Sequence, residues 1–276
     1  MTSAVRNNAL AGPVRHILSL SGGKDSTALA IYMRGRVPEM EYVFCDTGEE
    51  LPDTHQYLDK LEAFLGKSIV RLNPDRPFRH YLQIYRGVLP DPRTRWCTKM
   101  LKIRPFERFV GDGLVVSYVG IRADESHRKG YISTKPNITP RYPFVEGNIR
   151  KADVMRILDE SGLGLPSYYR WRSRSGCYFC FFQQRREWVG LLETYEKLFW
   201  QAAAFEKVDP ASGERFTWVQ GESLKELSRP ERLAKIKEEY DRRLAESPGG
   251  AEKDAPLMQV FGDDPGSGQG CLVCHL

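Results

Sequence analysis

The sequence of 276 residues has no apolar run of about 18 residues, and this excludes a transmembrane helix. Its first 13 residues lack the apolar core of a secretory signal peptide, so we expect a cytoplasmic protein without a membrane partner. No internal repeat is present. With 41% hydrophobic and 28% charged residues, the composition is that of an ordinary globular protein with enough apolar material for a sizeable core.

Cysteine is scarce as well. Six cysteines in a chain expected in the cytoplasm argue against a disulfide scaffold. Four of them form two pairs with the spacing C-x-x-C, which favours metal binding or redox chemistry. The pairs are Cys177 with Cys180 and Cys271 with Cys274. Cys97 and Cys45 stand alone, and we expect Cys45 to be packed because it ends a predicted strand.

Acidic residues are missing from two basic stretches, 92–106 and 161–186. Each contains five basic side chains and at least one cysteine. Charged runs are usually solvated faces, but two such runs around cysteines favour a site that meets phosphates. In the second stretch, Arg170-Trp171-Arg172 suits either phosphate contact with base stacking or an ordinary surface around a half-buried tryptophan.

Residues 19–26, Ser-Leu-Ser-Gly-Gly-Lys-Asp-Ser, join a predicted strand over 15–20 to a predicted helix over 26–34. The Walker sequence G-x-x-x-x-G-K-S/T does not occur. Gly22 and Gly23 permit a tight turn and the close approach of a ligand. The N–H groups at the start of the helix can then bind an anion together with Ser21, Lys24 and Ser26. The alternative is a Gly-Gly turn that caps an ordinary helix.

Strand patterns alternate with helical patterns over the first 150 residues. This alternation predicts an α/β fold with a doubly wound, mainly parallel sheet and crossover helices. The predicted strands cover 15–20, 41–45, 68–72 and 114–119. The glycine loop and the segments 46–49 and 120–122 follow three of these strands. Because ligands bind at the carboxyl ends of parallel strands, we expect one shared nucleotide pocket.

The character of the sequence changes after residue 150. We expect a nucleotide-binding domain over 14–150, a helical, cysteine-bearing region over 151–246 and a flexible tail over 247–276, which is rich in Gly, Pro and Asp. Apolar periodicity in the second region predicts helices over 152–160, 187–206 and 223–245.

Charged residues in the polar segments predict how a nucleotide is held. Lys24 can neutralise phosphate oxygens, and Asp25 or Asp46 can hold a magnesium ion through oxygen ligands. Arg122 can grip a phosphate or a carboxylate with two parallel hydrogen bonds. Taken singly, each carboxylate could equally cap a helix or a turn.

Several motifs occur in an order that resembles a known family. The glycine loop is similar to the PP-loop of the N-type ATP pyrophosphatases, and it is followed by Lys102 and by the segments 45–49, 95–98, 120–126 and 175–180. Together they resemble the phosphoadenosine phosphosulfate (PAPS) reductase-like family of adenine-nucleotide α-hydrolases over residues 14–205. The resemblance implies that ATP is split into AMP and pyrophosphate with Mg²⁺. The ATP contacts that it implies are Ser19, Ser21, Gly22, Gly23, Lys24, Asp25, Ser26, Asp46, Thr47 and Arg122, of which Lys24, Asp25, Asp46 and Arg122 form the catalytic set.

Within this family the chain is most similar to the ATP pyrophosphatase subunits of DNA phosphorothioation systems of the Dnd and Ssp types. This likeness implies that ATP activates a backbone phosphate of DNA and that sulfur replaces a non-bridging oxygen. It implies a cysteine desulfurase as the sulfur donor and other subunits of the modification system as partners.

Three other functions stay open. A PAPS or adenylyl-sulfate reductase would not cleave ATP, and the intact S-G-G-K-D-S loop argues against it. The chain end shares with those reductases only a cysteine next to a histidine, Cys274 and His275. A tRNA thiolase would use the same ATP chemistry on a base carbonyl. A DNA-binding or assembly subunit would bind ATP without turnover.

The resemblance also suggests a role for the cysteines. Cys97 and the pair Cys177 and Cys180 are separated as in the adenylyl-sulfate reductases, where a Cys-Cys pair and a C-x-x-C hold a 4Fe–4S cluster. Trp96 stands here in place of the first cysteine of that Cys-Cys pair, so three ligands remain. Cys271 or Cys274 is the candidate fourth ligand. The alternatives are zinc bound by the two C-x-x-C pairs, and free thiols.

Overall fold

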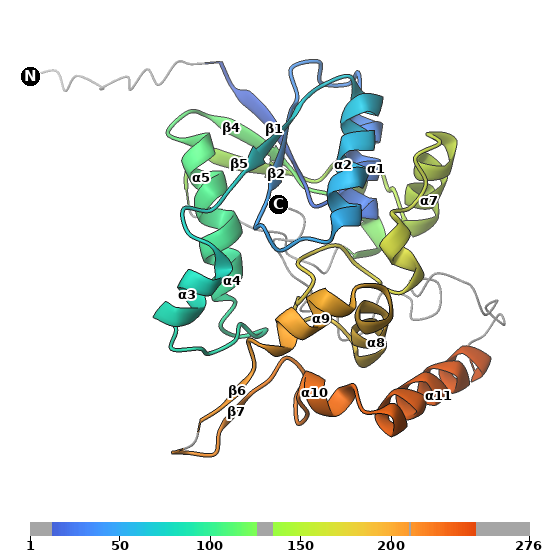
Figure 1. Ribbon diagram of the computed structural model, residues 1–276. Coiled ribbons are helices and arrows are strands. Elements are labelled where there is room, and N and C mark those ends of the chain that lie inside the picture. The colour runs from blue at the N-terminus through green and yellow to red at the C-terminus, as the bar shows by residue number, and fades with distance from the viewer. Residues whose placement is uncertain (1–12, 126–134, 210, 247–276) are drawn as a thin grey trace, which may run out of the picture.

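The computed structural model describes residues 13–125, 135–209 and 211–246. Its centre is a sheet of five parallel strands in the order β3-β2-β1-β4-β5 (Figure 1). The strands are β1 (Arg15–Leu20), β2 (Glu41–Cys45), β3 (Ile69–Leu72), β4 (Val115–Tyr118) and β5 (Ile138–Arg141). The predicted α/β fold with a doubly wound parallel sheet is therefore confirmed.

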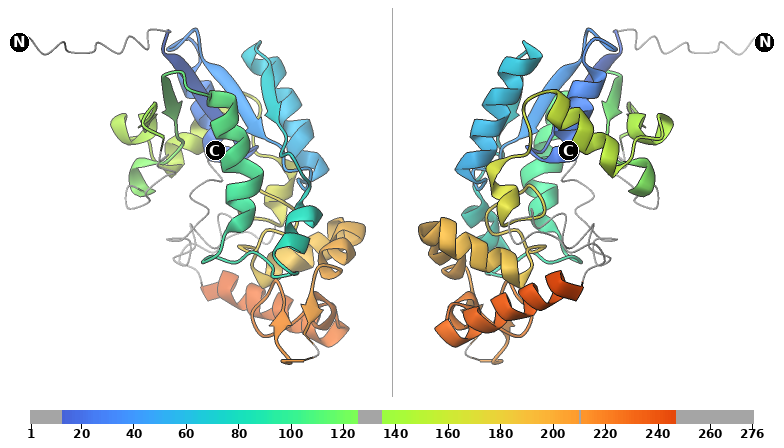
Figure 2. Two further views of the ribbon diagram at one scale, coloured as in Figure 1. Left: turned by 90° about the vertical axis from the view of Figure 1, so that its left-hand side faces the viewer. Right: turned by 90° about the vertical axis from the view of Figure 1, so that its right-hand side faces the viewer.

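Helices cover both faces of this sheet (Figures 1 and 2). A strand that is buried on both faces needs apolar side chains at successive positions. In β1, Leu18 accordingly packs in one cluster with Leu29, whereas its neighbour Ile17 packs in another with Phe106. The first cluster lies beneath α1 (Lys24–Met33), α2 (Pro52–Leu65) and α7 (Lys151–Glu160), and the second lies beneath α5 (Arg104–Val110).

The strand order changes direction at β1, which has β2 on one side and β4 on the other. At such a position the connections that leave neighbouring strands diverge, and a crevice opens at the carboxyl ends. The glycine loop leaves β1 at this edge, and residues 119–122 leave β4 beside it. Two of the polar segments predicted to bind nucleotide therefore meet at the crevice.

A second group of helices lies below the sheet in Figure 1. It is organised around an aromatic cluster in which the ring of Phe179 lies 4.3 Å from that of Phe78 and 5.1 Å from that of Trp218. Its elements are α8 (Arg185–Thr194), α9 (Glu196–Ala203), β6 (Lys207–Val208), β7 (Arg215–Phe216), α10 (Leu224–Leu227) and α11 (Pro230–Glu246). The remaining short elements are α3 (Phe78–Ile84), α4 (Trp96–Thr98), the π-helix η1 (Lys99–Ile103), η2 (Ala123–Glu125), α6 (Pro143–Glu146) and η3 (Ser167–Arg170). In the described part of the chain, every helix is too short or too polar to cross a membrane.

Two predicted helices are each divided in two. The helix predicted over 187–206 breaks at Tyr195, whose backbone leaves the helical region and whose hydroxyl donates to Asp53 Oδ2 of α2 at 2.7 Å. The helix predicted over 223–245 breaks before Pro230, because proline lacks the N–H group that would continue the preceding helix.

One strand of the five-stranded sheet, and both strands of the β6–β7 pair, are absent from the sequence prediction. β5 contains Pro140, which cannot donate a hydrogen bond to a neighbouring strand. The strand lies at the edge of the sheet next to β4, where a missing donor is tolerated.

Gly190 in α8 provides a test of the packing between the helical region and the loop before it. A Cβ atom at this position would lie 2.7 Å from Trp171 Cβ and 2.8 Å from its Cε3. Gly190→Ala should therefore lower the free energy of unfolding by about 1–3 kcal/mol, although alanine favours helix by about 1 kcal/mol.

Urea denaturation followed by circular dichroism would measure this change. Gly113→Ala is the matched control, because nothing lies within 4 Å of a Cβ there and its unfolding free energy should stay within about 0.5 kcal/mol of the wild type. A Gly190→Ala protein more stable than wild type would show that helix propensity outweighs the contact with Trp171.

Candidate functional site

The glycine loop is held by groups far away in the sequence. Gly22 has a φ of +70°, a conformation that glycine adopts readily, and a Cβ there would lie 2.6 Å from Thr54 Cγ2. The hydroxyl of Tyr168 donates to the carbonyl oxygen of Gly22 at 2.7 Å. The predicted tight turn is therefore present, and α2 and η3 fix its position.

Hydroxyl groups gather at this loop. Ser21 Oγ lies 3.0 Å from Ser26 Oγ, and Ser175 Oγ donates to Ser21 Oγ at 3.1 Å. The backbone N–H of Lys24 donates to the Tyr169 hydroxyl at 3.1 Å. Such a set of hydroxyl donors and acceptors suits phosphate oxygens.

Gly23 shows how closely these groups approach. A Cβ there would lie 2.6 Å from Ser175 Oγ and 3.2 Å from the Tyr169 hydroxyl oxygen. Sequence reasoning gave no role to Tyr169 or Ser175. Ser175 is the first residue of the segment 175–180, and the similarity of that segment to the family could have predicted a role for it.

A buried ion network lies behind the loop. Lys24 Nζ is 2.8 Å from Asp25 Oδ2, and Arg122 Nη1 is 2.9 Å from Asp25 Oδ1. Arg122 is fully buried and also contacts the carboxylates of Asp124 and Glu125, at 3.1 and 3.3 Å. Arg122 was predicted to bind either a carboxylate or a phosphate, and in the structure it binds carboxylates.

Charge balance decides the state of Lys24. Burial by itself lowers the pKa of this ammonium group, but the neighbouring Asp25 carboxylate outweighs that effect, so the pKa is raised. Lys24 therefore stays cationic at neutral pH. Ser19, the first residue of the predicted set, is buried in β1, and its hydroxyl has no hydrogen-bond partner among the described residues.

Asp46 belongs to a second group of side chains, at the end of β2. One ligand atom each of Asp46, Glu50 and His55 lies within 4.8 Å of the others. Asp46 Oδ1 also accepts from the N–H of Gly48 at 2.9 Å, so Asp46 caps the turn as well. Two carboxylates suit Mg²⁺, which prefers oxygen ligands, whereas the imidazole is a ligand that transition metals take more readily.

The C-x-x-C loop packs against the same segment. Thr47 Oγ1 donates to Glu50 Oε1 at 2.7 Å and lies 3.3 Å from Cys177 Sγ. The N–H of Tyr178 donates to the carbonyl oxygen of Glu49 at 2.8 Å. Burial, and then the Glu50 charge, hold the pKa of the Cys177 thiol well above its usual range. Cys177 is therefore a protonated thiol here.

Arg172 holds this loop from behind. It is fully buried and donates to the carbonyl oxygens of Gly176 and Cys177, at 3.0 and 2.7 Å. Trp171 beside it is also buried. Of the two roles predicted for Arg170-Trp171-Arg172, these contacts favour a structural one.

The other cysteines have different surroundings. Cys45 is buried as expected, and desolvation raises the pKa of its thiol to about 12. Cys97 and Cys180 are partly buried, and neither is in a disulfide. In the described ranges, Asp46, Glu50 and His55 form the one set of three ligand atoms that all lie within 4.8 Å of one another, so Cys97, Cys177 and Cys180 do not surround a single metal ion. Cys271 and Cys274 lie outside the described residues.

Residues 15–142 match the family model of the phosphoadenosine phosphosulfate reductase domain. The matched stretch, which is similar to that domain, contains the sheet, the glycine loop and the 46–50 segment.

Similar curated proteins include two uncharacterized proteins of Methanocaldococcus jannaschii. They are 27% identical over 177 residues and 26% identical over 195 residues, which is 59% and 66% of this chain and 35% and 45% of theirs. An uncharacterized nin region protein of Escherichia phage lambda is 27% identical over 173 residues, or 51% of this chain and 57% of that protein. The chain thus spans less than two thirds of the length of each of these relatives.

Two solved structures are also similar. A phosphoadenylyl-sulfate (PAPS) reductase from Candida auris, in a phosphate complex, has a TM-score of 0.47 at 14% identity and covers 62% of this chain and 85% of its own. The U34-tRNA thiolase NcsA from Methanococcus maripaludis, with its 4Fe–4S cluster, has a TM-score of 0.36 at 13% identity and covers 71% of each chain.

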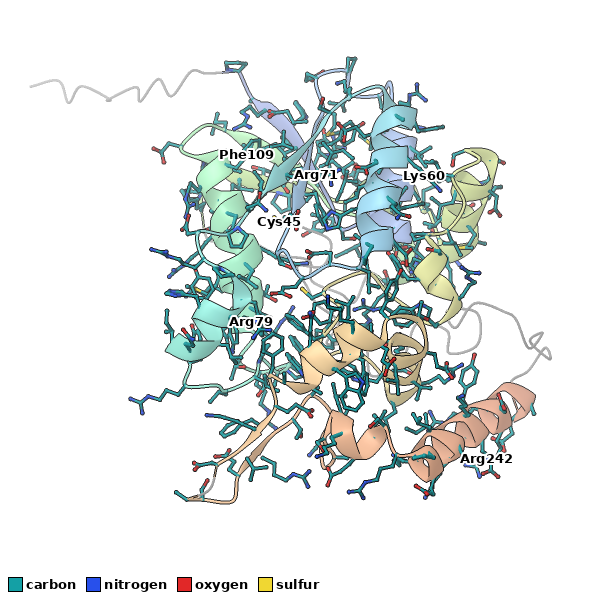
Figure 3. The ribbon with its side chains drawn as sticks, in the orientation of Figure 1. Cys45, Lys60, Arg71, Arg79, Phe109 and Arg242 are labelled. Carbon is teal, nitrogen blue, oxygen red and sulfur yellow. The ribbon has the colours of Figure 1, made fainter. Side chains whose placement is uncertain are left out.

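Glu49 predicts a pH dependence of stability. Burial raises the pKa of this carboxyl to about 7, although hydrogen bonding by Tyr178 and the charge of Arg79 on α3 oppose the shift (Figure 3). The folded state therefore binds the proton more tightly than the unfolded state, in which the pKa is 4.5. Between these two values the free energy of unfolding should fall as the pH rises.

Urea denaturation of the wild type and of Glu49→Gln at several pH values would measure this effect. The variant should lose the part of the decline that lies between about pH 4.5 and 7. Parallel stability curves for the two proteins across this range would contradict the prediction.

Proposed function

We propose that this protein splits ATP into AMP and pyrophosphate and thereby activates a backbone phosphate of DNA for sulfur insertion. The observation that carries the proposal is the loop after β1, where the hydroxyls of Ser21, Ser26 and Ser175 gather around the start of α1 beside the buried cation Lys24. Hydroxyls, helix N–H groups and one ammonium ion match the charge and hydrogen-bonding needs of a pyrophosphate group.

The residues at the loop take different parts in this proposal. Lys24 stabilises the negative charge that develops on the leaving pyrophosphate. Asp25 and Arg122 position Lys24 and do not contact ATP. One carboxylate oxygen of Asp25 binds Lys24 and the other binds Arg122. Gly22 and Gly23 let Thr54 and Ser175 pack closely against the loop.

Asp46 is the proposed magnesium ligand, with Glu50 and His55 beside it. When bound, Mg²⁺ would neutralise phosphate oxygens and orient the leaving group. Thr47 fixes the carboxylate of Glu50 through its hydroxyl and its N–H group. Asp46 is favoured over Asp25 because the Asp25 carboxylate already has two cationic partners.

Sulfur chemistry is assigned to the cysteines. Cys97, Cys177 and Cys180 would hold a 4Fe–4S cluster with Cys271 or Cys274, and zinc on the two C-x-x-C pairs is the alternative. Cys97 and Cys177 pack against the aromatic cluster around Phe179, and Cys180 lies in the same loop as Cys177. None of the three is in a disulfide, and cysteine sulfur is the donor that holds 4Fe–4S clusters. The cluster when bound would supply a site for sulfur.

The proposed reaction consists of two displacements at phosphorus. An oxygen of the acceptor phosphate attacks the α-phosphorus of ATP, and pyrophosphate leaves. A thiol reductant, which is oxidised to a disulfide, releases hydrosulfide from the persulfide of a cysteine desulfurase. The hydrosulfide then attacks the acceptor phosphorus, and AMP leaves with the former non-bridging oxygen. Other subunits of a DNA modification system would be its partners. Reduction of PAPS is the second candidate, which the family match over residues 15–142 favours.

Removal of the Lys24 charge tests the ATP chemistry. Lys24→Gln should lower the rate of AMP and pyrophosphate formation from ATP by about a hundredfold or more, because a buried cation no longer faces the leaving group. Lys60→Gln is the control, since Lys60 is an exposed lysine of α2 (Figure 3). Wild-type turnover in the Lys24 variant would refute the assigned role, and sulfite release from PAPS without ATP would favour the reductase.

Mass spectrometry of digested DNA and RNA tests the acceptor. Cells with the native gene should contain phosphorothioate-linked dinucleotides in DNA, and cells with the Lys24→Gln gene should lack them. Loss of a thiolated tRNA nucleoside instead would keep the ATP chemistry and replace DNA by tRNA. An unchanged pool of both would contradict sulfur insertion into nucleic acid.

A further inference from the structure

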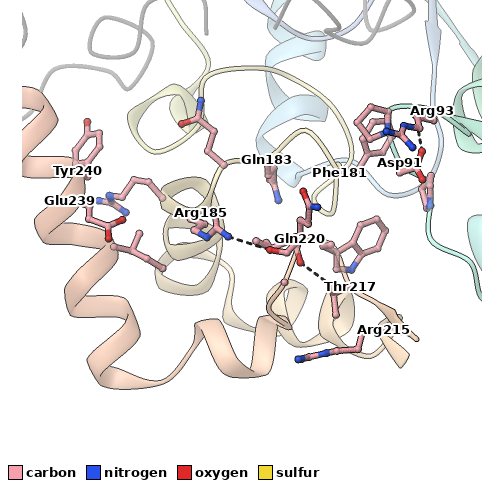
Figure 4. A pocket seen from close by; sticks show the side chains of 18 of the residues that line it. Asp91, Arg93, Phe181, Gln183, Arg185, Arg215, Thr217, Gln220, Glu239 and Tyr240 are labelled. Carbon is pink, nitrogen blue, oxygen red and sulfur yellow. Dashed lines mark hydrogen bonds between the residues drawn. The ribbon is translucent and has the colours of Figure 1, made fainter. Parts of the chain in front are cut away.

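A large cavity lies in the C-terminal region, bordered by α8, α11, residues 90–93 and residues 215–221. Figure 4 shows Glu239 and Tyr240 of α11 on one side of it and Asp91 and Arg93 on the other. Its volume is about 1180 Å³. Because most small-molecule pockets measure about 300–1,000 Å³, this cavity has room for more than one compact ligand group.

The lining of the cavity is strongly basic. Two of its residues carry carboxylates, Asp91 and Glu239. Asp91 Oδ1 accepts the N–H groups of Arg93 and Thr94 at 2.7 Å, so this carboxylate is engaged in its own turn. Against these two stand five arginines, Arg93, Arg185, Arg186, Arg215 and Arg243. The excess of positive charge predicts an anionic ligand.

These arginines can change partners. Arg185 pairs with Glu222, and Arg215 pairs with Glu226, but both arginines are exposed. Exposed ion pairs contribute little to stability, so a phosphate can replace Glu226 at small cost. Glu222 is less exposed, but it keeps Arg232 as a partner at 2.8 Å when Arg185 turns to a phosphate. Arginine also binds phosphate with two parallel hydrogen bonds, which favours a phosphate over a smaller anion.

Gln183 adds an uncharged polar group to the cavity lining. The residue lines the cavity and is 7% exposed, yet neither Nε2 nor Oε1 of its amide has a hydrogen-bond partner among the described residues. A buried amide without partners costs free energy that a ligand would recover. An amide offers one acceptor beside one donor, which is the complement of the edge of a nucleobase.

An aromatic side chain also lines the cavity. Half-buried Phe181 lines the cavity two residues before Gln183 and offers a ring face for stacking. Gln183 also lies directly after the C-x-x-C loop, since its N–H donates to the carbonyl oxygen of Cys180 at 2.9 Å. Phe181 directly follows Cys180, so the cavity lining begins next to a proposed sulfur-handling cysteine.

We propose that this cavity binds an unpaired nucleotide of a nucleic-acid strand, with the base edge on Gln183 and the flanking phosphates on the arginines. The inference rests on the proposed function, for which it names the binding site of the acceptor. DNA and RNA share the chemistry that the cavity recognises, and binding measurements on both distinguish them.

Fluorescence anisotropy of the full chain without ATP tests the cavity. The probes are labelled single strands of DNA and of RNA of about 12 nucleotides, a length within the range of single-strand sites. Gln183→Leu should weaken binding by about tenfold or more. Arg243→Gln should weaken it and lower the slope of log affinity against log salt by about 1.

Arg242→Gln is the matched control, because Arg242 is the exposed neighbour of Arg243 on α11, carries the same charge and does not line the cavity (Figure 3). It should bind both probes as the wild type does. Equal melting temperatures of the three variants and the wild type would exclude a general loss of folding.

Lys24→Gln separates the two proposals, since it should bind the strands normally. If Arg243→Gln binds more weakly than the wild type while Arg242→Gln binds as the wild type does, the cavity inference stands even if no protein forms AMP. A wild type that binds neither DNA nor RNA would overturn the inference. Equal weakening by Arg242→Gln and Arg243→Gln would overturn it too, because the effect would then be one of net charge.

Discussion

The contact on which the rest of the site depends joins one buried carboxylate to two buried cations. Asp25 at the start of α1 binds Lys24 through one oxygen and Arg122 through the other. This contact ties the connection that leaves β1 to the connection that leaves β4, on the two sides of the crevice. Removal of one partner from such a buried pair typically costs about 3–5 kcal/mol, because it leaves an uncompensated charge.

The C-terminal region completes the loop that this network supports. Tyr168, Tyr169 and Ser175 bond to the loop through their hydroxyls, and Arg172 holds the C-x-x-C segment that follows them. The helical, cysteine-bearing region is therefore part of the site at the carboxyl edge of the sheet. It supplies part of the hydroxyl set at which we propose that pyrophosphate leaves.

The basic residues divide into two groups with different environments. Arg122 and Arg172 are fully buried and are bound to carboxylates or to backbone carbonyls, so they stabilise the fold around the loop. The arginines of the cavity come from separate segments between Arg93 and Arg243, and several are exposed. The sequence alone does not distinguish the buried arginines from the exposed ones. A large anionic ligand can reach only the exposed arginines.

Local patterns in the sequence determined the parallel α/β fold, four of the five strands of the sheet and the glycine turn, because alternating periodicities and a Gly-Gly pair act over a few residues. Tertiary structure decided the rest. The break at Tyr195 needs a hydrogen bond to Asp53, and the hydroxyl set needs Ser175, which lies 154 residues from Ser21. Only the packed chain brings Asp46 together with His55 and draws Asp25 to Arg122. Such contacts arise from burial and charge compensation across the whole fold, and no local pattern records them.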